Sequence, residues 1–202
     1  MHGNPWYFDP DISHWEPSAD EALSHLIGLF ENPLSALGNY ADSQISQGLT
    51  YLVNTMASGD SGWFSSRAAS VSQRLRAIGA IYSLFDQLFR PQCAPIMSHL
   101  DEEGAKPLNG NCYMWWDSFP SVALPGDPDR LALHDAVLAV MGKILTLDSI
   151  ACQESALHGL GHWQRERPMI VESNIDRFLR SNTALDHRLV AYAQAARCGC
   201  VL

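Results

Sequence analysis

The spacing of apolar residues between positions 71 and 89 constrains the fold more than any other feature of the sequence. Steps of four, three, four, three and four residues separate Val71, Leu75, Ile78, Tyr82, Phe85 and Phe89. Steps of three and four place side chains on one face of an α-helix. Ile81, Leu84 and Leu88 widen this face. A stripe this wide predicts a helix that is packed in a core on more than one side.

Similar spacing recurs along the chain and predicts an all-α fold. Ser18, followed three residues later by Glu21, forms a capping box that predicts the start of the first helix. We expect helices near residues 18–31, 42–56, 71–89, 127–147, 149–162, 168–181 and 186–197. Several of the links are short, as antiparallel neighbours require. No run of alternating β-branched residues is present, so we expect essentially no sheet.

The composition indicates one globular domain over residues 1–202. Apolar residues make up 47% of the 202 residues and charged residues 17%, which excludes a disordered chain. Residues 1–17 hold aromatic rings without helical spacing, so we expect an extended arm. Residues 101–127 are interrupted by glycine and proline, so we expect a long irregular loop, of a length that is usually functional or poorly ordered.

Charge and cysteine content limit the environment and the partners. The net charge of −9 disfavours nucleic acid and anionic lipid as partners. No stretch of 18 apolar residues could span a membrane, and the N-terminus lacks the pattern of a secretory signal. The five cysteines are odd in number and form no CxxC pair, which is typical of reduced thiols. We therefore expect a cytoplasmic protein.

Residues 149–181 resemble a HEAT-type helical repeat. Ala156, Leu157, Leu160 and Gly161 match the first helix of that family, with Cys152 at its apolar position. The second helix has apolar side chains at the expected steps, which are Val171, Ile175, Phe178 and Leu179. The resemblance implies antiparallel helical hairpins stacked as a short HEAT-like superhelix that binds other proteins. The expected loop at 101–127 departs from a regular repeat.

Four residues in the expected loop, Tyr113, Trp115, Trp116 and Asp117, form the most unusual cluster and are our candidate binding residues. One Trp ring would anchor the loop in the core, and the other would lie at a groove mouth, where Trp is common in binding hot spots. Alternatively, both rings pin the loop to the helices.

Glu154, His158 and His162 recur every four residues and would line one face of a helix. Two histidines at this spacing can share a metal ion, and a carboxylate can complete the site. If Cys152, Ala156 and Leu160 face the core, however, this stripe faces solvent. We favour the solvated face and expect no bound metal and no cofactor.

The sequence therefore favours a non-enzymatic protein-binding module. It contains no GxSxG elbow and no phosphate-binding glycine loop. Because the chain is acidic, its partner would be another protein with a basic patch. The first alternative is a small-molecule-binding helical protein or enzyme, with a pocket under the 101–127 loop and with Trp115, Asp117 and a histidine as working groups. The second alternative is a metal-dependent enzyme.

Overall fold

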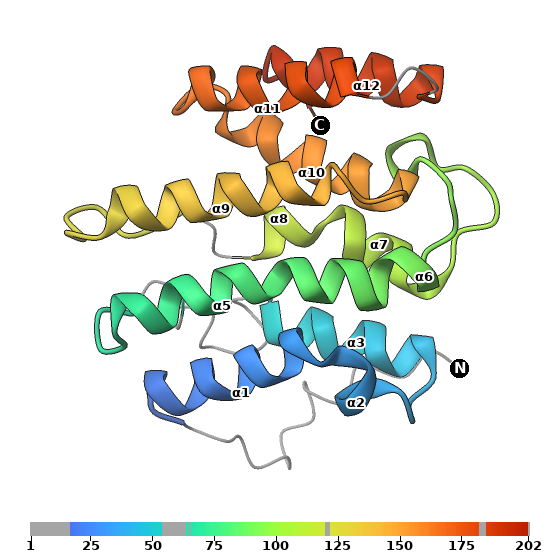
Figure 1. The fold of residues 1–202 in the computed structure, drawn as a ribbon. Helices are drawn as coiled ribbons and strands as arrows, with labels where there is room; N and C mark the ends of the chain where they lie inside the picture. The colour runs from blue at the N-terminus through green and yellow to red at the C-terminus, as the bar shows by residue number, and fades with distance from the viewer. Residues whose placement is uncertain (1–16, 54–63, 65, 120–121, 182–184, 202) are drawn as a thin grey trace.

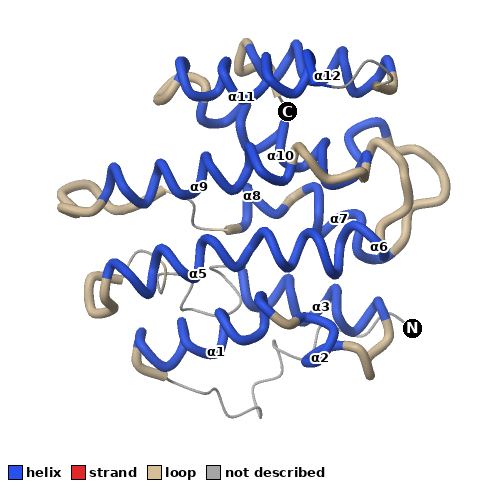
Figure 2. Tube along the Cα trace, in the orientation of Figure 1, coloured by secondary structure: helices blue, strands red, loops and turns tan. Residues whose placement is uncertain are grey.

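The computed structural model describes residues 17–53, 64, 66–119, 122–181 and 185–201. This part of the chain contains helices and no strand, which confirms the all-α prediction (Figures 1 and 2). The longer helices are α1 (Ala19–Glu31), α3 (Asp42–Val53), α5 (Val71–Leu84), α9 (Arg130–Ile144), α10 (Ile150–Trp163), α11 (Pro168–Ser181) and α12 (His187–Arg197). The shorter ones are α2 (Pro33–Leu37), α6 (Arg90–Gln92), α7 (Pro107–Tyr113), α8 (Trp115–Ser118), the π-helix η3 (Phe85–Phe89) and the 3₁₀-helix η4 (Ser98–Leu100). None of the described helices has the length and apolarity needed to cross a membrane.

Two predicted helices show how the sequence fixes local structure. The capping box of α1 is present, since Ser18 Oγ accepts a hydrogen bond from the Glu21 amide and the Glu21 carboxylate accepts one from the Ser18 amide. The apolar stripe from Val71 onward is helical as predicted, but its last turn, η3, is a π-helix. The aromatic side chains of Phe85 and Phe89 at its two ends are buried.

The helices lie in layers, with α10 between the layer of α7 and α8 and the layer of α11 and α12 (Figure 1). Helix α1 packs on α5, α5 packs on α9, and α10 contacts α7, α8, α9, α11, α12 and η3. Because neighbours surround it, every residue from Ala151 to Gly161 is buried. The expectation that the histidine face of this helix is solvated is therefore wrong for His158, which is 1% exposed.

The irregular loop expected at residues 101–127 contains two short helices, α7 and α8. Pro107 occupies the first turn of α7, where its missing N–H costs nothing. The buried Asn109 fixes the entry to this helix, because its Oδ1 accepts from the amides of Lys106 and Ala94 and its Nδ2 donates to the Ala94 carbonyl. Of the arm predicted at residues 1–17, all but the last residue lie outside the described residues.

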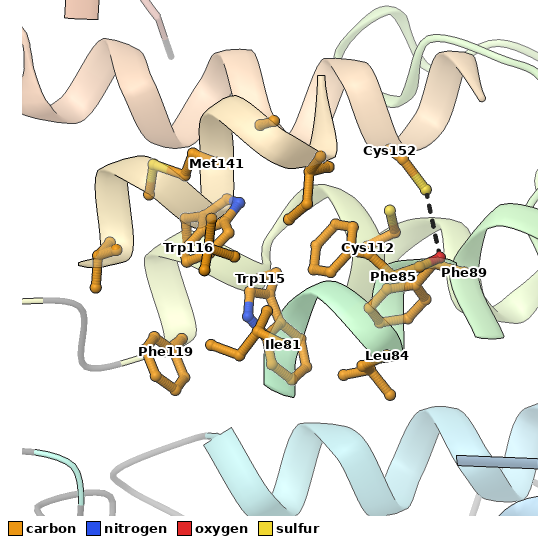
Figure 3. Packing of buried hydrophobic residues seen from close by; sticks show 14 of the residues in the cluster. Ile81, Leu84, Phe85, Phe89, Cys112, Trp115, Trp116, Phe119, Met141 and Cys152 are labelled. Atoms are coloured by element: carbon orange, nitrogen blue, oxygen red, sulfur yellow. Dashed lines mark hydrogen bonds between the residues drawn. The ribbon is translucent and has the colours of Figure 1, made fainter. Parts of the chain in front are cut away.

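Both tryptophans of α8 belong to the core (Figure 3). The Trp115 ring packs edge-on against Phe30, Phe85 and Phe89, and the Trp116 ring stacks on Phe85 at 6.1 Å between centroids. The interpretation in which one ring lies at a groove mouth is therefore wrong. Both rings fix α8 against the helices around it, which was the alternative interpretation.

Candidate functional site

Helices α8 and α10 bring three metal-ligating side chains together. Asp117 extends from α8, and His158 and His162 extend from successive turns of α10. Asp117 Oδ2 lies 2.8 Å from His158 Nε2, and Asp117 Oδ1 lies 2.8 Å from His162 Nε2. The two Nε2 atoms are 3.0 Å apart. Each residue of this cluster is therefore in contact with both of the others.

The three contacts of the Asp117–His158–His162 cluster cannot all be hydrogen bonds while Asp117 is ionised. A carboxylate oxygen only accepts hydrogen bonds, so both contacts of Asp117 require a hydrogen on the facing Nε2 atom. Both N–H groups would then point at Asp117, and the two donor nitrogens would lie 3.0 Å apart with no hydrogen bond between them. If either hydrogen is removed, a nitrogen lone pair faces a carboxylate oxygen at 2.8 Å instead. A metal cation bound by all three atoms would remove this conflict.

Tyr192 of α12 orients His158 through Nδ1, the ring nitrogen that does not face Asp117. Its hydroxyl oxygen lies 2.8 Å from His158 Nδ1 and can accept the hydrogen of that nitrogen. Nε2 then keeps its lone pair and is directed at the cluster. Burial lowers the pKa of His158, against the opposing effect of the Asp117 carboxylate, and thereby favours the neutral ring. A neutral, oriented imidazole is the form that binds metal ions.

The cluster is open to solvent on one side. The His158 side chain is 1% exposed, whereas those of Asp117 and His162 are 28% and 44% exposed. The buried imidazole is held by Tyr192 and by the Tyr113 ring, whose centroid lies 4.7 Å from that of His158. An ion bound here would thus have protein behind it and solvent in front of it.

Glu154, which the sequence placed with the two histidines, has a different role. Its fully buried carboxylate accepts hydrogen bonds from the amides of Ser98 and His99, at 2.8 and 3.0 Å. A third contact joins it to His99 Nδ1 at 2.6 Å. Asp117 supplies the carboxylate of the cluster instead. Sequence spacing could not show this, because 41 residues separate Asp117 from His158.

The four candidate binding residues thus occupy different environments. Asp117 belongs to the cluster, and Tyr113 contacts it through His158. Trp115 and Trp116 lie in the core behind it. Tyr113 and Tyr192 also line a cavity of about 670 Å³, between η4 and α12. Tyr192 could not be identified from the sequence, because no spacing or motif distinguishes this residue from other core aromatics.

No protein-family model, no curated protein and no solved structure matches this chain. The HEAT-like resemblance of residues 149–181 consequently stays a prediction. The function has to be inferred from the chemistry of the residues that the fold brings together.

Proposed function

We propose that this protein binds one divalent first-row transition-metal ion through Asp117, His158 and His162, and that the centre is catalytic. The observation that carries the proposal is the mutual contact of one carboxylate and two imidazole nitrogens, with the two nitrogens only 3.0 Å apart. The expected absence of a metal at this position is thereby revised, with Asp117 in the place of Glu154.

The spacing of the ligand atoms matches one face of an octahedral site. Atoms bound about 2.1 Å from a shared ion, at right angles to one another, lie about 3 Å apart. The three distances here are 2.8, 2.8 and 3.0 Å. Two histidines and one carboxylate on one face leave the opposite positions for water or substrate, an arrangement found in catalytic iron sites.

The residues around the centre supply what such a site needs. A bound ion would act as a Lewis acid and lower the pKa of a coordinated water. Tyr192 fixes the orientation of His158 through the contact at Nδ1, as outer-shell partners of metal-bound histidines do. Asp117 and His162 are part-exposed, which gives substrate a way to reach the open positions.

The protein-binding function implied by the HEAT-like resemblance is our second candidate. Contacts of α11 with both α10 and α12 support it, because stacked repeats contact their sequence neighbours. However, α10 also contacts α7, α8 and η3, which are not its neighbours in the chain. A central helix of this kind is unusual for a quasi-linear repeat, so we rank metal binding first.

Titration of metal-free protein with Co²⁺ or Zn²⁺ tests the first candidate. Calorimetry should give one equivalent bound. Asp117→Asn and His158→Ala should each weaken binding by a factor of about 100 or more, since each removes one of three ligands. His25→Ala is the matched control, because it removes an exposed histidine of α1 and should leave the affinity unchanged.

The visible absorption of the Co²⁺ form tests whether the centre has open positions. A weak spectrum typical of five- or six-coordinate cobalt should change when azide is added, because azide displaces water from an open position. Absence of stoichiometric binding, or equal losses in His25→Ala and His158→Ala, would contradict the metal site. A spectrum that azide leaves unchanged would contradict its catalytic character.

A further inference from the structure

The cavity between η4 and α12 is a second feature with chemistry of its own. Its volume is about 670 Å³, and Asp117, His158 and His162 are not among the residues that line it. Leu100, Ala191 and Ala195 give it apolar surface, and Tyr113 and Tyr192 separate it from the cluster. A pocket of this size with a few polar groups suits a small organic ligand.

The His99 ring is held in a fixed orientation in the wall of this cavity. Its Nδ1 contacts the Glu154 carboxylate at 2.6 Å, and a carboxylate only accepts, so Nδ1 carries the hydrogen. The other ring nitrogen, Nε2, lies on the side away from the buried Glu154. The ring also stacks on Tyr192 at 4.2 Å between centroids, which fixes its plane. The cavity wall therefore contains an oriented imidazole.

The charges around the cavity favour a cation. Arg188 is the one permanently charged cation of the lining, and it forms ion pairs with both Glu102 and Asp186. Asp101 adds an exposed carboxylate that forms no ion pair with the described residues. The three carboxylates Glu102, Asp186 and Asp101 outnumber the single guanidinium of Arg188. The net charge around the cavity is therefore negative, like that of the whole chain.

The charges around the cavity also disfavour an anionic ligand. An anionic ligand would meet unfavourable charge in this cavity, together with an Arg188 whose guanidinium is already paired.

We infer that the cavity is a binding site for a small organic ammonium ion, with an N–H group that donates to the Asp101 carboxylate and the positive charge beside it. The apolar side chains of Leu100, Ala191 and Ala195 would contact the hydrocarbon part of the ligand. This site goes beyond the proposed metal function and does not depend on it, because no ligand of the metal cluster takes part.

Benzylamine and three analogues of similar shape test the inference. Each is titrated into ¹⁵N-labelled protein while the amides of Ser98, Ala191 and Ala195 are followed by NMR. Benzylamine should shift these amides saturably and bind about tenfold more tightly than neutral benzyl alcohol, a difference typical of one charge-assisted contact. Benzyltrimethylammonium has the charge but no N–H donor and should bind more weakly than benzylamine. Benzoate should be the weakest ligand.

Two matched variants separate the cavity from general electrostatic attraction. Asp101→Asn should remove most of the preference for benzylamine over benzyl alcohol. Asp148→Asn makes the same charge change at an exposed residue outside the cavity and should keep that preference. The inference is overturned if benzoate binds as tightly as benzylamine, if both variants behave alike, or if no probe shifts the cavity amides.

Discussion

At the scale of single residues, Gly159 shows why α10 can lie so close to its neighbours. A Cβ atom at this position would lie 2.6 Å from Cγ of Trp116 and 2.8 Å from Cε of Met141. The indole ring is part of the packed core and cannot move aside without disturbing its partners. The missing side chain at Gly159 therefore allows close helix approach, with α8 as the element that approaches it.

We predict that Gly159→Ala destabilises the protein by about 1–3 kcal/mol, because the added methyl group overpacks the core. Gly79→Ala is the control in another helix, where a Cβ atom would meet nothing within 4 Å. That substitution should stabilise the protein by up to about 1 kcal/mol through helix propensity. Urea unfolding of both variants measures the difference. A stable Gly159→Ala variant would show that Trp116 can shift.

At the scale of elements, a buried ion pair joins α5 to the segment that leads into α9. Arg74 of α5 contacts Asp127 at 2.6 Å and Asp129 at 3.0 Å, and the side chains of Arg74 and Asp127 are 2% and 0% exposed. The hydrogen bond from Arg74 lowers the pKa of Asp127. Because the folded pKa is lowered, the pair contributes stability above the ordinary carboxyl pKa and loses it as the pH falls.

Arg74→Met should reduce the free energy of unfolding by about 3–5 kcal/mol near neutral pH, since it leaves the buried Asp127 without its ion-pair partner. The deficit should shrink below about pH 4, where Asp127 can take up a proton. Urea midpoints at both pH values give the measurement. Arg76→Met on the same helix removes a solvent-exposed pair with Glu31 and should have little effect at either pH. An equal effect of the two substitutions would mean that the buried pair adds no specific stability.

The longer helices could be predicted because each carries its own signal. The capping box at Ser18 and the apolar stripe from Val71 are local patterns, and both gave helices at the expected places. Helices α7 and α8 have only seven and four residues, too few for a periodic pattern to appear. The π-helical turn at Phe85–Phe89 has the same apolar spacing as the α-helix before it, so the sequence could not distinguish the two.

At the scale of the whole molecule, the candidate site depends on the burial of α10. Two of the three cluster residues extend from this helix, and the third comes from α8, which packs against it. The spacing of His158 and His162 was visible in the sequence. Their carboxylate partner and the supporting Tyr192 were not, because these contacts join residues that are 41 and 34 positions apart from His158. Only the packing of the complete fold brings them together.

The central position of α10 predicts where the fold is most resistant to opening. Helix α10 is buried from Ala151 to Gly161, whereas α11 buries only Val171, Ile175 and Phe178. Local opening of α11 exposes little apolar surface, but opening of α10 breaks contacts with helices on every side. The amides from Ala156 to Trp163 should therefore exchange with solvent deuterium only through global unfolding. Their exchange free energies should equal the value from urea unfolding, with those of α11 clearly lower. Exchange in α10 as fast as in α11 would show that the helix opens on its own, and a site built on it would then lack the rigid support that a metal centre requires.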